Sequence, residues 1–157
     1  MSIEAVRAYL GQWDMDKKIM EFTTSSATVE LAAQALGVIP ARIAKTLSFK
    51  LNDECILIVA AGDAKVDNQK YKAEFSQKAK MMTAEEVLEF TGHAVGGVCP
   101  FGLANGDIKV YADVSMKRFD TLFPACGSSN SAIELTCDEI IKYANVTKWV
   151  DVCKGWE

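Results

Sequence analysis

The feature that most constrains the fold is an unbroken apolar run from Cys55 to Ala61, which follows a segment with a different periodicity. In residues 45–51 apolar and polar side chains alternate, and a period of two is typical of a β-strand. The apolar run ends at Gly62 and is far shorter than the roughly 20 residues of a membrane-spanning helix, so it indicates a buried strand. Asn52 and Asp53, which favour turns, lie between the two segments. We therefore expect two paired antiparallel strands at the centre of the fold.

Helix signals occur along the chain without a regular alternation with strands. Apolar residues recur at helical spacing in residues 2–12, and residues 28–36 form a second amphipathic stretch that Gly37 ends. Two capping boxes, Thr83 to Glu86 and Thr136 to Glu139, begin further helices. A polar helix is expected near residues 69–75, and further strands are expected at 20–22, 108–114, 123–126, 132–135 and 146–152. This irregular order predicts an α+β fold, a single domain with a mixed, largely antiparallel sheet and surrounding helices.

Length and charge limit the classes of function. The chain has 157 residues, of which 50% are apolar, enough for one domain with a substantial core, and we expect residues 1–157 to form that domain. The formal charge of −4 argues against a strong positive field that would hold long polyanions or an anionic membrane. Glu4 and Arg7 interrupt the N-terminal apolar residues, so no signal peptide is expected. We therefore expect a cytoplasmic protein with no membrane partner.

The cysteine and histidine content argues against disulfide and metal chemistry. The five cysteines are odd in number and include no C-x-x-C pair, and the single histidine, His93, is not at ligand spacing from them. We therefore expect neither a bound metal nor a cofactor. Cys99 lies in a glycine-rich segment, where it is either a reactive thiol or a small side chain in the core. No base adjacent to Cys99 in the sequence supports a thiol mechanism.

Two features of the sequence are candidates for ligand binding, a glycine-rich loop and a lysine. Three glycines surround a proline in residues 96–102, and such a segment lets a ligand approach backbone N–H groups, although a structural turn explains the pattern equally well. Lys45 lies where the turn at Pro40 becomes a strand. Its ammonium group either pairs with a phosphate or carboxylate of a ligand or extends into solvent.

The order of several segments along the chain is more specific than any one of them. The segments are T-V-E-L-A-A-Q-A-L-G-V at residues 28–38, Ala44–Leu47, the G-x-x-x-P loop at Gly96–Pro100, and Cys126-Gly127 ahead of Ile133–Leu135. In this order they resemble the YbaK/ProX-like family of aminoacyl-tRNA editing domains, which is related to the editing insertion of bacterial prolyl-tRNA synthetase. The resemblance covers roughly residues 20–145.

The resemblance implies a hydrolase that cleaves the ester between an amino acid and the 3′-terminal adenosine of a mischarged tRNA, without a metal. It implies that Lys45 holds the 3′ end near the scissile ester, and that Gly96 and Pro100 belong to a loop whose backbone places the ester and a water. These three are the expected catalytic residues. An activated ester needs little beyond positioning, backbone donors and water, so the chemistry agrees with the composition. Further expected substrate contacts are Thr46, Gly97, Val98, Cys99, Phe101, Gly102, Cys126 and Gly127.

The expected substrate is tRNA(Pro), or another tRNA that carries a small wrong amino acid such as Ala, Ser, Thr or Cys, and the expected action is in trans. Ala132 stands where cysteine-specific members of the family carry an aspartate, and no Lys-Arg pair follows the glycine turn, which argues against Cys-tRNA(Pro). The alternative is a catalytically silent module that binds an aminoacyl-tRNA or amino acid and acts in regulation.

The expected partners are the aminoacylated 3′ end of tRNA and, as a further possibility, an aminoacyl-tRNA synthetase, while the oligomeric state is left open. Five lysines at 65, 70, 72, 78 and 80 outnumber Asp67 and Glu74 locally. They form either a contact for the acceptor stem or a solvated helix face.

Overall fold

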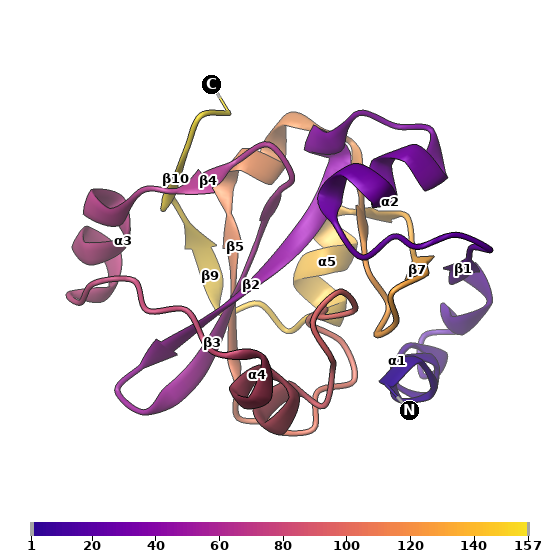
Figure 1. The fold of residues 1–157 in the computed structure, drawn as a ribbon, viewed down its shortest axis with the longest axis horizontal. Coiled ribbons are helices and arrows are strands. Elements are labelled where there is room, and N and C mark those ends of the chain that lie inside the picture. The colour runs from indigo at the N-terminus through magenta and orange to yellow at the C-terminus, as the bar shows by residue number, and fades with distance from the viewer. Residues whose placement is uncertain (1, 157) are drawn as a thin grey trace.

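The computed structural model describes residues 2–156, and its centre is a mixed six-stranded sheet in the order β8-β6-β2-β3-β5-β9 (Figure 1). The two long strands, β2 (Ile43–Leu51) and β3 (Glu54–Ala61), pair antiparallel. The parallel pairings join β2 to β6, β3 to β5 and β5 to β9. Two small antiparallel pairs, β1 with β7 and β4 with β10, flank the sheet. The α+β class with a mixed sheet is therefore confirmed. The shorter strands are β1 (Met20–Glu21), β4 (Lys65–Val66), β5 (Lys109–Asp113), β6 (Thr121–Pro124), β7 (Ser131–Ala132), β8 (Leu135–Thr136), β9 (Lys148–Val150) and β10 (Cys153–Lys154).

The turn between β2 and β3 consists of the two residues expected from the sequence. Asn52 and Asp53 have φ angles of 53° and 66°. A two-residue hairpin turn of this kind requires positive φ at both central positions, which Asn and Asp adopt more readily than most residues. The turn fixes the register of the hairpin, in which Lys45 lies opposite Ala60.

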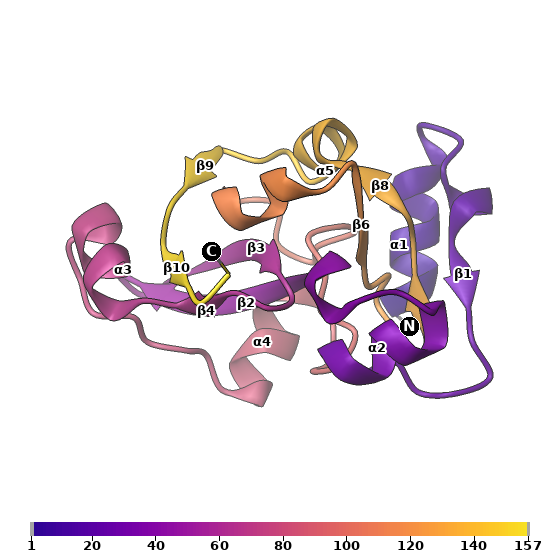
Figure 2. The same cartoon turned by 90° about the horizontal axis from the view of Figure 1, so that it is seen from above.

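After Glu54, β3 is apolar because both of its faces are covered. Leu57 and Val59 pack into the core that includes residues of α1, α4 and α5, whereas Ile56 and Ile58 pack into a second core with Tyr71 of α3. A strand buried on both faces has no solvent side on which polar residues would alternate. Figure 2 shows α3 and the β4–β10 pair at one end of the molecule and α1 with β1 at the other.

The helices begin and end at the capping residues that the sequence indicates. Thr28 accepts a hydrogen bond from the N–H of Leu31, and Gly37, with φ of 70°, ends that helix. Both capping boxes form, at Thr83 and at Thr136. The α-helices are α1 (Ser2–Gly11), α2 (Val29–Leu36), α3 (Asn68–Phe75), α4 (Ala84–Thr91) and α5 (Cys137–Tyr143), and 3₁₀ helices occupy Asp16–Lys18, Pro40–Arg42 and Val114–Arg118.

Three of the expected strands differ from those observed. The strand expected at 123–126 begins earlier and ends at Pro124, and the one expected at 132–135 is divided between β7 and β8, which pair with different strands. The last strand is shorter than the expected 146–152 because the N–H of Val152 donates to Oδ1 of Asp113 at 3.0 Å instead of joining a ladder. None of the helices within residues 2–156 is long and apolar enough to cross a membrane.

Candidate functional site

The candidate site lies where one edge of β2 is left uncovered. β6 pairs with β2 only at Ile43 and Ala44, and the next contact on that edge is the bond from the N–H of Met82 to the carbonyl of Ser48 at 3.1 Å. Two residues farther along, the N–H of Lys50 also bonds across this edge. Because backbone groups alternate in direction along a strand, those of Thr46 point to the same side, into the interval between the two neighbouring segments. An uncovered edge offers backbone donors and acceptors to a ligand.

A cavity of about 230 Å³ lies at this uncovered edge. Its wall combines the start of α2, the edge of β2, the segments on either side of α4, the end of β6 and the short strand β7. The lining is mainly apolar and includes Ala32, Ile43, Met82, Val87, Val98, Phe123 and Ala132. The concave shape and the few polar groups in the wall are typical of a small-molecule site.

Lys45 lies on the wall of this cavity with its ammonium group held by backbone carbonyls. Nζ donates to the carbonyl of Gly62 at 3.4 Å and to the carbonyl of Ala64. Burial lowers the pKa of Lys45, and the nearby Cys153 thiol and Asp63 carboxylate partly oppose this effect. The head group is therefore partly desolvated and fixed in place, unlike a lysine whose ammonium extends freely into water.

Of the glycine-rich loop, Gly96 and Val98 reach the cavity. Gly96 has φ of 98°, a conformation that L side chains rarely adopt. Gly97 and Pro100 are buried beneath the surface of the loop. A Cβ atom at Gly97 would lie 2.7 Å from the backbone nitrogen of Ser128, so the loop depends on glycine there to pack against the turn at residues 126–130. Gly102 has a similar role against the backbone of Ala5 in α1.

Of the other residues expected to contact substrate, Thr46 lines the cavity and the rest lie outside its wall. Cys99, Phe101 and Cys126 are each 0% exposed and belong to the core between the sheet and α1. A Cβ at Gly127 would lie 2.7 Å from the carbonyl oxygen of Ser2, so this glycine is in contact with the start of α1. These residues support the loop and the turn from behind, and we expect them to act on substrate only through that support.

Cys99 has a neighbour that the sequence does not reveal. Its Sγ atom lies 3.6 Å from Nε2 of His93, which also lies 2.7 Å from the carbonyl oxygen of Phe101. A base is therefore adjacent in space. However, His93 is 0% exposed, burial lowers its pKa, and burial raises the pKa of the Cys99 thiol to about 12. A thiol that stays protonated and is closed to solvent is a poor nucleophile.

This placement predicts that Cys99→Ala retains deacylation activity on aminoacyl-tRNA. The loss of the buried sulfur is expected to cost about 1–2 kcal/mol of unfolding free energy, because a small cavity forms in the core. The measurement is the deacylation rate of the variant, together with the rate of the native chain after treatment with iodoacetamide. An inactive Cys99→Ala variant that is still folded, or rapid inactivation by iodoacetamide, would support a thiol mechanism instead.

The sequence did not point to several residues of the cavity wall. Ser26 and Ala27 precede the cap of α2, and Met81 and Met82 precede the cap of α4. Each pair lies next to a capping residue, where the chain enters a helix at a fixed angle, but no sequence pattern indicates that these two entries meet. Within residues 2–156 no group of three or more His, Cys, Asp or Glu side chains is arranged to hold a metal ion.

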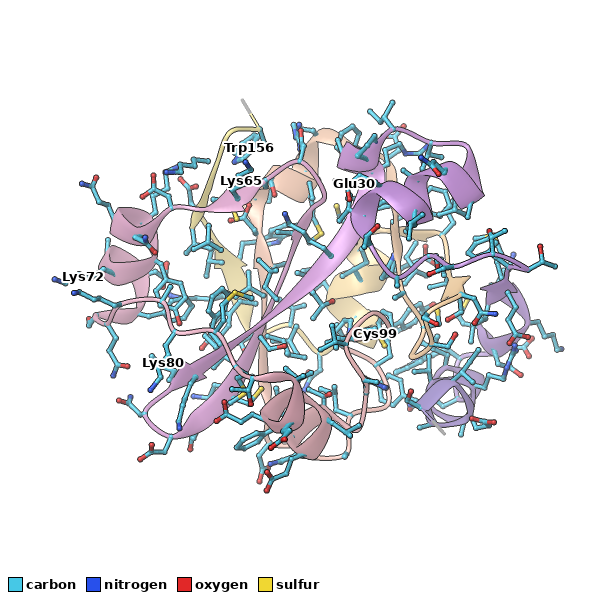
Figure 3. The ribbon with its side chains drawn as sticks, in the orientation of Figure 1. Glu30, Lys65, Lys72, Lys80, Cys99 and Trp156 are labelled. Atoms are coloured by element: carbon cyan, nitrogen blue, oxygen red, sulfur yellow. The ribbon has the colours of Figure 1, made fainter. Side chains whose placement is uncertain are left out.

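The five lysines of residues 65–80 do not all lie together. Lys78 and Lys80 lie with Lys50 around the β2–β3 turn. Lys65 lies opposite Lys154 in the β4–β10 pair, and its charge contributes to lowering the pKa of Lys45. Figure 3 shows Lys65 near one edge of the molecule, away from Lys72 and Lys80. Of these lysines, Lys65 is therefore the one whose charge acts on Lys45 in the cavity wall.

Comparisons with known proteins agree with this arrangement. A family model described as "Aminoacyl-tRNA editing domain" matches residues 23–143. The chain is 58% identical to YwhH of Bacillus subtilis (strain 168), described as uncharacterized, over 100% of both chains. It is 35% identical to a proline–tRNA ligase of Thermosipho melanesiensis over 69% of this chain, but it spans only 20% of the ligase. A solved structure provisionally described as a trans-editing enzyme for prolyl tRNA synthetase is 26% identical, with a TM-score of 0.87 over 98% of each chain.

Proposed function

Because the chain belongs to the aminoacyl-tRNA editing domain family, we propose that it is a deacylase that acts in trans on a tRNA carrying the wrong small amino acid. The substrate is tRNA(Pro) or another tRNA charged with a residue the size of alanine, serine or threonine. The match to a B. subtilis protein over the whole length of both chains, and to ligases over about a fifth of theirs, supports an action separate from a synthetase.

The observation that supports the proposal most directly is that Lys45 and Gly96 line the same cavity. The two residues are far apart in the sequence, and they line the same hollow beside an uncovered strand edge. The hollow has a fixed cation on one side and a glycine-rich backbone on another. An aminoacylated 3′ end needs both, since it is anionic at its phosphates and carries a polarised carbonyl at its ester.

The proposed reaction needs only water. The oxygen of water attacks the ester carbonyl carbon, the bond from this carbon to the ribose oxygen breaks, and the proton from water ends on the ribose oxygen. A free amino acid and a tRNA with a free terminal hydroxyl leave. Lys45 positions the 3′ end, and backbone N–H groups near Gly96 and Val98 stabilise negative charge on the carbonyl oxygen.

The size and lining of the cavity limit the amino acid. A volume of about 230 Å³ holds a small aminoacyl group with part of the ribose, and among residues 2–156 no carboxylate lines the cavity to pair with a cationic side chain. Ala132 is in the wall, 2% exposed. At this position the chain therefore has no aspartate to contact a cysteinyl substrate, whereas cysteine-specific members of the family do.

A panel of tRNA(Pro) charged separately with Ala, Ser, Thr and Cys tests the function and the substrate together. We expect hydrolysis of at least one of the first three, faster than the spontaneous rate, and slow hydrolysis of the cysteinyl ester. Saturable binding without deacylation across the whole panel would show instead a regulatory binding module. Neither binding nor hydrolysis would contradict the proposal.

Lys65 and Lys154 are expected to contribute to tRNA binding and not to the chemical step. They are exposed and opposite each other, and like charges at such positions repel unless an anion lies between them. The double variant Lys65→Gln/Lys154→Gln is expected to raise KM for aminoacyl-tRNA about three- to tenfold, to weaken its salt dependence, and to leave kcat unchanged. With a 3′-aminoacyl-adenosine, which lacks the tRNA phosphates, the same variant should match the native chain. An equal effect on both substrates would exclude this role.

A further inference from the structure

Two hydroxyl groups at the cavity have no hydrogen-bond partner among the described residues. They are Oγ of Ser26 and Oγ1 of Thr46, and both residues line the cavity. Ser26 is 7% exposed, so its hydroxyl is not left to bulk water. Buried polar atoms are almost always paired in folded proteins, and an unpaired one needs an explanation.

Two other hydroxyl groups in the wall, those of Ser131 and Thr28, already have hydrogen-bond partners. Oγ of Ser131 accepts from Ser128 Oγ at 2.7 Å, and the hydroxyl of Thr28 accepts from the N–H of Leu31 at the start of α2. Ser26 is itself held in place, because its N–H donates to the carbonyl of Ser129 at 2.6 Å. Ser26 and Thr46 therefore differ from Ser131 and Thr28 in that each has a buried hydroxyl without a partner among the described residues.

Both positions are on rigid parts of the fold. Thr46 is in the middle of β2, between the points where β6 and Met82 bond to that strand, and Ser26 stands just before the cap of α2. A polar group on a fixed backbone, with no partner of its own, keeps its hydrogen-bonding capacity available for a bound molecule. The rest of the wall is mainly apolar, so these hydroxyls mark the place where a polar substituent of the ligand belongs.

We propose that Ser26 and Thr46 determine specificity by hydrogen bonding to a side-chain hydroxyl of the aminoacyl group, so that the edited amino acid is serine or threonine. This inference rests on the proposed deacylase function. A substrate hydroxyl can donate to one of the two oxygens and accept from the other. Alanine, which has the same backbone and no hydroxyl, fits the volume and leaves both protein groups unpaired. A site built around a hydrogen bond discriminates in this way far better than an apolar pocket does.

The test compares seryl- and alanyl-tRNA(Pro) as substrates for Ser26→Ala and for Thr46→Val, which preserves the shape of threonine. The native chain is expected to have a higher kcat/KM for the seryl ester. Each variant should lower kcat/KM for the seryl ester about tenfold and leave that for the alanyl ester within about twofold, and the double variant should lose the preference. The matched control is Ser131→Ala, which removes a wall hydroxyl that is already paired and should change the two esters equally.

A binding measurement separates this inference from the proposed function. The probes are seryl- and alanyl-adenosine in which an amide replaces the ester, and the native chain should bind the seryl probe more tightly, with the difference lost in the double variant. If the native chain prefers the alanyl ester, or if Ser26→Ala and Thr46→Val slow both esters equally, these hydroxyls do not read the side chain, although the chain is still a deacylase. If no ester on the panel is hydrolysed, the proposed function itself fails, and the binding comparison still decides the role of the hydroxyls.

Discussion

Replacing Lys45 with alanine is expected to reduce the rate of aminoacyl-tRNA deacylation by about a hundredfold or more, while the chain stays folded. Lys45 supplies the fixed positive charge on the cavity wall, and its ammonium is held by the carbonyls of Gly62 and Ala64. Without it the anionic 3′ end loses its anchor beside the ester. The measurement is a single-turnover deacylation rate, with thermal unfolding followed on the same sample.

The matched control for this variant is Lys50→Ala. Lys50 is on the same strand and forms a partly exposed ion pair with Glu86 at 3.6 Å, but it does not line the cavity. Its replacement should leave deacylation within about twofold of the native rate, since an ion pair in contact with solvent contributes little to stability. Full activity in Lys45→Ala, or equal losses in both variants, would remove Lys45 from the proposed mechanism.

The pKa of Lys45 gives this prediction a pH dependence with a definite sign. Burial lowers the pKa below the ordinary value of 10.5, so the folded chain binds this proton less tightly than the unfolded chain does. The charge on Lys45 therefore costs stability at neutral pH, and this cost disappears as the pH rises through the folded pKa. Binding of an amide-linked aminoacyl-adenosine 5′-phosphate should weaken over the same rise in pH, and Lys45→Ala should lack that transition.

Local signals predicted most of the fold. The capping boxes at Thr83 and Thr136, the glycine that ends α2, and the turn at Asn52 and Asp53 each depend on a few neighbouring residues, and all are observed. The strands after Phe119 were less predictable. There β7 pairs with β1 and β8, only a few residues later, pairs with β6, and the hydrogen bonds that decide this come from distant segments.

The composition of the cavity depends on contacts that no single segment contains. Ser26 is positioned by Ser129, and the edge at Thr46 is free only because β6 leaves β2 at Ala44. Sequence reasoning selected Lys45 and Gly96, which line the cavity, but it also selected Cys99, which is in the core. Neighbours in a motif share a loop, yet alternate residues of that loop face opposite sides. A motif therefore indicates the loop, and only the fold indicates which of its residues reach a ligand.

Gly97→Ala is expected to have the second large effect, a loss of about 2–3 kcal/mol of unfolding free energy together with most of the activity. The added Cβ would lie 2.7 Å from the backbone nitrogen of Ser128 and 2.8 Å from the carbonyl carbon of Gly127. These backbone atoms cannot move as a flexible side chain does, so the loop must separate from the turn. For a chain of this size the midpoint of thermal unfolding should fall by about 5–10 °C.

Gly106→Ala separates this close contact from a general sensitivity of the segment to alanine. Gly106 lies in the same connection between α4 and β5, and apart from its two chain neighbours no described residue has an atom within 4 Å of a Cβ added there. Its replacement should leave unfolding within about 0.5 kcal/mol of the native value and preserve activity. If Gly97→Ala is as stable and active as Gly106→Ala, the loop does not depend on its contact with the turn. In that case the motif does not require glycine in order to keep Gly96 and Val98 in place at the cavity. If Gly97→Ala is folded at low temperature but inactive there, the same contact holds the backbone donors at the position that hydrolysis needs.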